Sequence, residues 1–165
     1  MLKTTKNIVE MYKKQAKDII KSNKAKEKAM KSRVKNTRQA IKQRVEKKFR
    51  LWYRLSQADE NGNVKCYTCG RTHNYKKVDA GHYIHRKLGL DERNYKIQCG
   101  YCNQHLSGNM AVYTQNLIRD YGIKWVEKLE KDAEEYIRYE VSYMLEVEKE
   151  LNKKIKDLKD IIESY

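Results

Sequence analysis

The stretches Cys66-Tyr-Thr-Cys69 and Cys99-Gly-Tyr-Cys102 contain all four cysteines of the chain, with 29 residues between the two pairs. Each CxxC pair places two thiolates on one turn, and four thiolates complete the closed tetrahedral site that structural zinc prefers. The alternatives are two disulfides, which a reducing cytosol opposes, or unrelated core thiols, which the paired spacing opposes. We therefore expect one structural zinc ion, which would hold this short central segment folded, bound by Cys66, Cys69, Cys99 and Cys102.

The interval between the two pairs is longer than the roughly 15 to 20 residues of a bare zinc ribbon, so it has room for further structure. It contains Val78-Asp-Ala-Gly-His-Tyr-Ile84, whose alternation predicts a strand, and then a polar loop over residues 86–94. Directly after the second pair, Asn103-Gln-His-Leu-Ser-Gly-Asn109 begins like a helix and stops at Gly108. The predicted order is a zinc knuckle, a strand with a histidine, a loop, a second knuckle and a helix that starts with asparagine.

The charge of the chain is concentrated in one arm. Residues 1–55 hold 19 Lys and Arg against 4 Asp and Glu, whereas residues 56–165 hold 18 of each sign. With a net charge of +15, nucleic acid is favoured as the partner over an anionic membrane surface. No run of about 18 apolar residues occurs, and the N-terminus lacks the apolar segment of a signal peptide. We expect a cytoplasmic protein without a membrane partner, located in the host cytoplasm if a phage encodes it.

The composition predicts long helices at both ends. Hydrophobic residues make up only 39% of the 165 residues, which excludes a large dry core, and proline is absent. An apolar stripe of helical spacing runs from Met30 to Leu55, while residues 21–29 are either a solvated helix or a flexible stretch. A second stripe follows Gly122 and is broken at Glu148. The predicted parts are a basic helical DNA-binding arm over 1–55, a zinc-clipped module over 56–122 and a long amphipathic helix over 123–165.

This arrangement resembles the zinc-bound ββα-metal nucleases, also called HNH or His-Me finger nucleases. Asp79-Ala-Gly-His-Tyr and Gln98-Cys-Gly-Tyr-Cys-Asn-Gln-His-Leu-Ser-Gly-Asn109 look like the phage NinG/Rap recombination endonucleases, and the likeness covers residues 50–122. The asparagine after the fourth cysteine is also similar to phage endonuclease VII, a resolvase of branched DNA. The resemblance implies a mainly α chain with a small zinc-bound ββα-metal module. It also implies a magnesium-dependent endonuclease, with manganese as the alternative ion, that cuts Holliday junctions and D-loops.

Carried over residue by residue, the resemblance makes His82 the general base, Asn94 the asparagine that fixes the loop, and Asn103 a metal ligand at the start of the helix. Many members of the wider superfamily place a metal-binding Asp or His directly before the general base, where this chain has Gly81. Asp79 lies two residues before Gly81 and would point to the same face of a strand, so we expect it to replace that ligand. The expected magnesium ligands are therefore Asp79 and Asn103.

These residue types suit phosphodiester hydrolysis. A neutral imidazole accepts a proton near neutral pH, and Mg²⁺ prefers the oxygen ligands that a carboxylate and an amide offer. The expected partner is branched DNA, with no small-molecule substrate. Two symmetrical cuts across a junction need two active sites, so we expect the C-terminal stripe to form a homodimer, with packing inside the chain as the alternative. The predicted DNA-binding residues are Lys31, Arg33, Lys35, Arg38, Lys42, Arg44, Lys47, Lys48, His85 and Arg86.

Two other functions remain open from the sequence. One is an HNH endonuclease that nicks or cuts ordinary duplex DNA at specific sites by the same chemistry. The other is a non-catalytic zinc protein that coats nucleic acid through its arm, with His82 merely structural. The presence of Asp79, His82 and Asn103 together favours the two enzyme hypotheses over the non-catalytic binding protein. Cleavage of a junction beside its linear duplex would separate the two enzymes.

Overall fold

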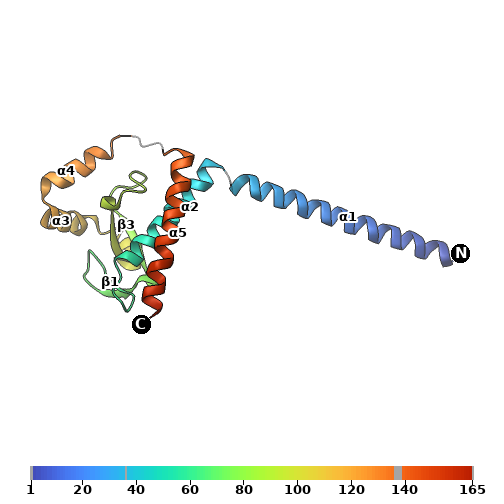
Figure 1. Cartoon of the computed structure of the whole chain (residues 1–165), viewed down its shortest axis with the longest axis horizontal. Coiled ribbons are helices and arrows are strands. Elements are labelled where there is room, and N and C mark those ends of the chain that lie inside the picture. Colours follow the sequence, from blue (N-terminus) through green and yellow to red (C-terminus); the bar gives the residue numbers. More distant parts are fainter. Residues whose placement is uncertain (1, 36, 136–138, 165) are drawn as a thin grey trace. The chain divides into compact units, whose positions relative to one another are not determined.

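The computed structural model describes residues 2–35, 37–135 and 139–164, and within the first helix it describes the side chains of residues 10, 13–30 and 33 (Figure 1). The chain forms two compact units, Met1–Ile41 and Lys42–Tyr165. It is mainly helical and contains two small antiparallel sheets, which confirms the predicted mainly α class. None of the described helices combines the length and the apolar character that crossing a bilayer requires.

The basic arm contains two helices. Helix α1 (Leu2–Lys35) includes residues 21–29, whose side chains are all exposed, so this stretch is a solvated helix. Met30, at the start of the predicted stripe, is 69% exposed. Among the stripe residues whose side chains the structure describes, the buried ones lie in α2 (Arg38–Ser56). The hydroxyl oxygen of Thr37 accepts a hydrogen bond from the backbone N–H of Ala40 at 3.2 Å, which caps the first turn of α2.

Two hairpins lie at the centre of the second unit. The predicted strand is present as β3 and ends at His82, which lies opposite Tyr95 in the register of the hairpin. A π-helix, η3, begins at Tyr101 within the second cysteine pair and ends at His105. A short helix is therefore present here, but it starts two residues before the predicted Asn103. The antiparallel pairs are β1 (Asn63–Lys65) with β2 (Thr72–Asn74) and β3 (Val78–His82) with β4 (Tyr95–Cys99), and the short helices are η1 (Tyr75–Lys77), η2 (Glu92–Asn94) and η3 (Tyr101–His105).

The single helix predicted over 123–165 is two helices in the structure, α4 (Ile123–Asp132) and α5 (Val141–Glu163). The prediction was wrong because the two halves of the apolar stripe pack against different helices. Helix α4 packs on α3 (Met110–Tyr121), whereas α5 lies beside α2 (Figure 1). Ile137, which the stripe included, lies outside the described residues. The buried residues of the α3–α4 core are Tyr83, Leu88, Tyr113, Leu117, Val126, Leu129 and Ala133.

The contact between α2 and α5 explains the polar break in the C-terminal stripe. Glu148 accepts hydrogen bonds from Arg44, 2.6 Å from Nε and 2.7 Å from a terminal nitrogen, and Lys48 lies 2.9 Å from the same carboxylate. The bond from Arg44 lowers the pKa of Glu148 to about 2, so this carboxylate stays charged at neutral pH. On either side of it along α5, Met144 and Leu151 are buried within the chain. Part of the stripe therefore packs within a single chain, and the homodimer stays a prediction.

Gln98 on β4 braces the central hairpin. Its side chain is 1% exposed, and its amide nitrogen donates to the carbonyl oxygen of Gly108 at 2.6 Å and to the hydroxyl of Thr68 at 3.3 Å. Its side-chain oxygen has no hydrogen-bond partner among the described residues and lies against Gly81, where an added Cβ would overlap it. Residue 81 must therefore be glycine as long as Gln98 keeps this position.

Gly81→Ala is expected to lower the free energy of unfolding by about 1–3 kcal/mol, because Gln98 would have to leave the buried carbonyl of Gly108 without a partner. In a Gln98→Ala background the same substitution should cost less than about 0.5 kcal/mol, because the overlapping atom is gone. Urea unfolding of the four proteins measures the coupling. Gly100→Ala is the control, since a Cβ there meets no atom within 4 Å. If Gly81→Ala lowers the free energy of unfolding equally in both backgrounds, the proposed contact between Gln98 and residue 81 is contradicted.

Candidate metal centre and active site

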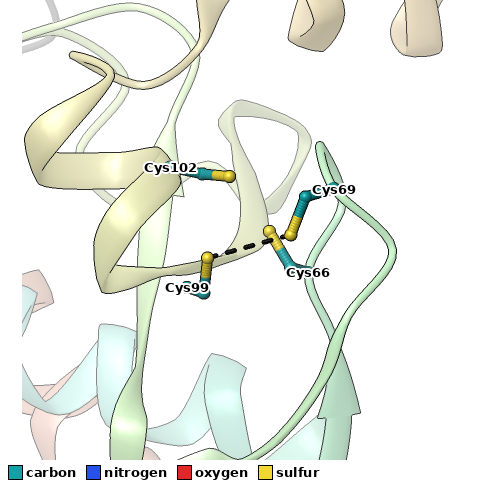
Figure 2. A group of neighbouring side chains, drawn as sticks. All are labelled: Cys66, Cys69, Cys99 and Cys102. Carbon is teal, nitrogen blue, oxygen red and sulfur yellow. Dashed lines mark hydrogen bonds between the residues drawn. The ribbon is translucent and has the colours of Figure 1, made fainter.

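The four cysteines converge from two separate segments. Cys66 and Cys69 lie in the turn after β1, whereas Cys99 ends β4 and Cys102 lies in η3 (Figure 2). All four Sγ atoms lie within 4.8 Å of one another, and those of Cys69 and Cys99 are 3.9 Å apart. A tetrahedral zinc ion with Zn–S bonds of about 2.3 Å separates its sulfurs by about 3.8 Å. The geometry therefore fits a structural metal such as zinc.

The thiols of this cluster need a cation to ionise together. Burial raises the pKa of Cys102 to about 12. Burial also opposes ionisation of Cys66, but hydrogen bonds from the Thr68 hydroxyl and from backbone amides outweigh it and lower its pKa to about 6. Four thiolates this close repel one another strongly unless a metal neutralises them. A closed set of four sulfurs suits zinc and has no open position for substrate. A metal bound here would therefore be structural rather than catalytic.

A second site lies between the central hairpin, η3 and α2. A hollow of about 230 Å³ collects three of the four candidate catalytic residues. Asp79 and His82 come from β3, and Asn103 comes from η3, one residue after the last cysteine. The zinc knuckle thus places Asn103 against the strand that carries the other two. The complete lining is Lys47, Arg50, Arg54, Asp79, Ala80, His82 and Asn103.

Asp79 and Asn103 are in direct contact. The amide nitrogen of Asn103 lies 3.0 Å from Oδ2 of Asp79, and that of Gln104 lies 3.2 Å from the same oxygen. Without a metal, these amide donors partly balance the carboxylate. Rotating the Asn103 amide by half a turn exchanges its nitrogen and oxygen and presents two oxygen ligands side by side. This donor set fits Mg²⁺, which takes its remaining ligands from water and phosphate oxygens.

His82 is kept neutral by its surroundings. Burial lowers the pKa of His82 below its ordinary value of 6.5, and the positive charges of His85 and Arg50 act in the same direction. The rings of His82 and His85 meet edge to face, with their centroids 4.3 Å apart. A neutral imidazole at the edge of the hollow can accept a proton at physiological pH.

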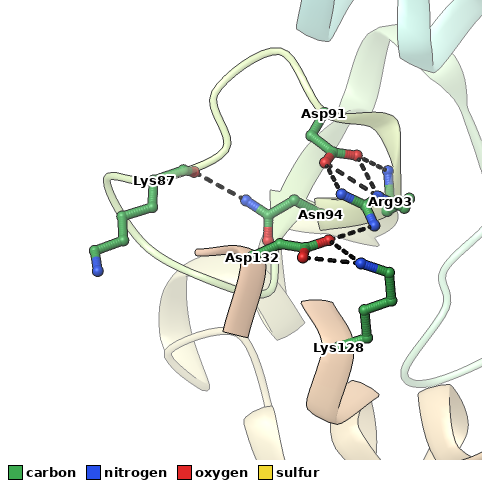
Figure 3. Close-up of polar contacts among 6 residues, drawn as sticks. All are labelled: Lys87, Asp91, Arg93, Asn94, Lys128 and Asp132. Carbon is green, nitrogen blue, oxygen red and sulfur yellow. Dashed lines mark hydrogen bonds and ion pairs between the residues drawn. The ribbon is translucent and has the colours of Figure 1, made fainter. Parts of the chain in front are cut away.

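Asn94, the fourth candidate, is buried outside this hollow and holds the loop that follows His82. Its amide nitrogen donates to the carbonyl oxygens of Ile84 and Lys87 at 3.0 and 3.1 Å, and its oxygen accepts from the backbone N–H of Ile84 at 2.7 Å. The same loop is tied to α4 through Arg93, which lies 2.8 Å from Asp132 (Figure 3). Asn94 acts on the site through the backbone and does not face the hollow.

The predicted DNA-binding residues divide by their surroundings. Arg44 and Lys48 form the ion pairs with Glu148 described above, and Lys42 lies 3.8 Å from Glu46. Lys47 alone of the ten lines the hollow. Among the others, Arg33, His85 and Arg86 are exposed and Arg38 is half-buried, while the side chains of Lys31 and Lys35 lie outside the described residues.

Sequence reasoning missed Arg50 and Arg54, which also line the hollow. A signal was present, because residues 47, 50 and 54 follow the three-four spacing of one helix face. The packing of α2 over β3 shows that this face meets the candidate site. Gln98 was missed as well, because its brace depends on residues far away in the sequence.

Cys102→Ser is expected to release the bound metal and unfold the central module, because the free energy of metal binding at such sites is largely free energy of folding. Elemental analysis of the purified protein measures the zinc, and circular dichroism measures the fold. Wild-type protein prepared in parallel is the reference and should carry zinc at all stages. A variant that has lost its zinc but keeps the wild-type spectrum and unfolding midpoint would overturn the structural role.

Comparisons with known proteins support the NinG part of the resemblance seen in the sequence. Protein ninG of Salmonella phage P22 is 36% identical to this chain over 106 residues, which cover 62% of the chain and 51% of the relative. Protein ninG of Escherichia phage 933W is 33% identical and that of Escherichia phage lambda 32% identical, each over 62% of the chain and 52% and 51% of the relative. The chain thus spans about half the length of the curated relatives it matches.

No solved structure matches the chain. The family model described as "Bacteriophage Lambda NinG protein" matches residues 2–162, which include both helices of the arm, the cysteine cluster and the hollow. Since that match covers almost the whole sequence, the chain belongs to the NinG family of lambda-like phages.

Proposed function

We propose that this chain is a metal-dependent DNA endonuclease that cuts branched recombination intermediates such as Holliday junctions and D-loops. The observation that carries the proposal is the convergence of Asp79, His82 and Asn103 on one hollow, with Asp79 and Asn103 in contact. A carboxylate, an amide and a neutral imidazole are the groups that metal-assisted phosphodiester hydrolysis needs. In this proposal β3, β4 and η3 form a ββα-metal module that the zinc centre holds together.

His82 performs the proton transfer in this reaction. Its neutral ring accepts a proton from a water molecule while the water oxygen attacks phosphorus, and the bond from phosphorus to the 3′-oxygen breaks. The leaving 3′-oxygen takes a proton from solvent, so the products carry 5′-phosphate and 3′-hydroxyl ends. A magnesium ion held by Asp79 and Asn103 would stabilise negative charge on the phosphate and leaving oxygens. Asn94 keeps the loop after His82 in place and so fixes the orientation of the ring.

The choice of branched DNA as substrate rests on the resemblance and on the distribution of charge. The exposed side chains of α1 are rich in Lys and Arg, and contacts of these residues to phosphates carry no base information. Selectivity must then come from the geometry of the substrate, and two copies with two active sites would match the symmetry of a four-way junction. Nicking of ordinary duplex DNA by the same hollow is the second candidate, and binding without catalysis is the third.

His82→Ala is expected to lower the cleavage rate by about 10² to 10⁴, the usual contribution of a general base, and to leave junction binding intact. Because burial lowers the pKa of His82 below 6.5, the active neutral form prevails from that pH upward. The kcat/KM of the wild type should therefore stay above half of its plateau at pH 6.5 and fall at lower pH. The control is His73→Ala, which changes a histidine on β2 that does not line the hollow. A midpoint above pH 6.5, or wild-type cleavage by His82→Ala, would contradict this role.

The 165-residue protein is expected to cut a synthetic four-way junction faster than the linear duplexes that make up its arms, at equal salt and Mg²⁺. The reason is that a junction lets several duplexes contact the basic surface at once, whereas a linear duplex engages only part of it. Gel assays with both substrates in one tube measure the preference directly. Equal cleavage of both would favour the duplex-nicking enzyme. If the protein binds the junction and the duplexes but cuts neither with Mg²⁺ or Mn²⁺ present, the non-catalytic binding protein would be favoured.

A further inference from the structure

Helix α2 directs three cations into the proposed active site. Lys47, Arg50 and Arg54 lie on one face of the helix and line the hollow that also contains Asp79 and His82. They come from a part of the chain outside the knuckles and the hairpin. The cations of α2 thus meet the reactive groups of β3 across the same cavity.

The three cations have different surroundings. Arg54 donates to the carbonyl oxygen of Val78 at 2.9 Å, so it holds α2 against the start of β3 and has a structural role. The side chain of Arg50 is 47% exposed, and its ion pair with Glu46 is long, at 3.7 Å. Lys47 is exposed and has no hydrogen bond or ion pair with any described residue. Arg50 and Lys47 can therefore both turn their charged groups toward a ligand in the hollow.

The charges of the hollow favour an anion. Three cationic side chains line it against the single carboxylate of Asp79, and two amides already donate to that carboxylate. With a volume of about 230 Å³, the hollow has room for a phosphate group with its ester oxygens. Phosphate oxygens accept short, charge-assisted hydrogen bonds from guanidinium and ammonium groups, so a phosphodiester meets both the charge and the donors of this wall.

We propose that Lys47 and Arg50 form a phosphate clamp that holds the scissile phosphodiester of DNA on the α2 side of the hollow, across from His82. This inference rests on the proposed nuclease function, which it extends by naming the protein groups that contact the reacting phosphate. The clamp opposes the negative charge that builds up on the phosphoryl oxygens as water attacks. Arg54 fixes the helix from which the clamp projects, and it acts as a positioning residue.

The test compares Lys47→Ala and Arg50→Ala with two matched controls that remove exposed cations outside the hollow, Lys124→Ala on α4 and Arg71→Ala before β2. Single-turnover cleavage of a junction is measured with Mg²⁺ and with enzyme in saturating excess over the DNA, so that a general loss of affinity does not lower the rate. Arg50→Ala should lose about 10²-fold in rate, the typical cost of removing one donor from a developing oxyanion, and Lys47→Ala should fall in the same direction. Arg50→Lys should recover part of that loss, since it keeps the charge but not the two-pronged geometry.

The outcomes separate the clamp from the nuclease itself. If the wild type cuts and all four alanine variants keep its saturating rate, the clamp is wrong and the nuclease stands. If the wild type does not cut, the nuclease proposal fails, and DNA binding in EDTA at fixed salt decides the clamp alone. Weaker binding by Lys47→Ala and Arg50→Ala than by Lys124→Ala and Arg71→Ala would then support a phosphate site, and equal binding would overturn it.

Discussion

The constraint on which the centre of this protein depends is the meeting of four cysteine sulfurs within 4.8 Å of one another. They join the turn after β1 to the end of β4 and the start of η3. The candidate site is built on the same segments: Cys99 ends the strand that pairs with β3, and Asn103 directly follows Cys102. A metal that draws the thiols together therefore also sets the distance between Asn103 and Asp79.

Gln98 links the cysteine cluster to the candidate site. It precedes Cys99, donates to Thr68 within the first cysteine pair and to Gly108 after η3, and leaves no room for a side chain at residue 81. This contact gives a physical reason for the glycine at residue 81. The space is filled from the neighbouring strand, and the carboxylate nearest to Asn103 is Asp79, two residues earlier on β3.

Local patterns carried most of what the sequence predicted about the centre of the chain. The CxxC spacing, the alternation around His82 and the position of Asn103 depend on residues close together in the sequence. The structure brings the four cysteines together, places His82 at the end of β3 and places Asn103 in the middle of η3. The C-terminal helix was predicted less well, because periodicity shows that a face is apolar but not which partner it meets. Arg50 and Gln98 were not predicted for the same reason, since their surroundings come from other elements of the fold.

The positive charge of the chain consequently has several uses that composition alone cannot separate. In α2, Arg44 and Lys48 are neutralised by Glu148, so these two cations of the arm stabilise the docking of α5. Arg54 is bound to the backbone of β3, while Lys47 and Arg50 face the hollow. The described charges of α1 are exposed and match the solvated basic arm that the sequence suggested. Helix α2 contacts both the C-terminal helix and the central hairpin and also lines the hollow, so the packing of the fold fixes the position of two cations at the proposed site.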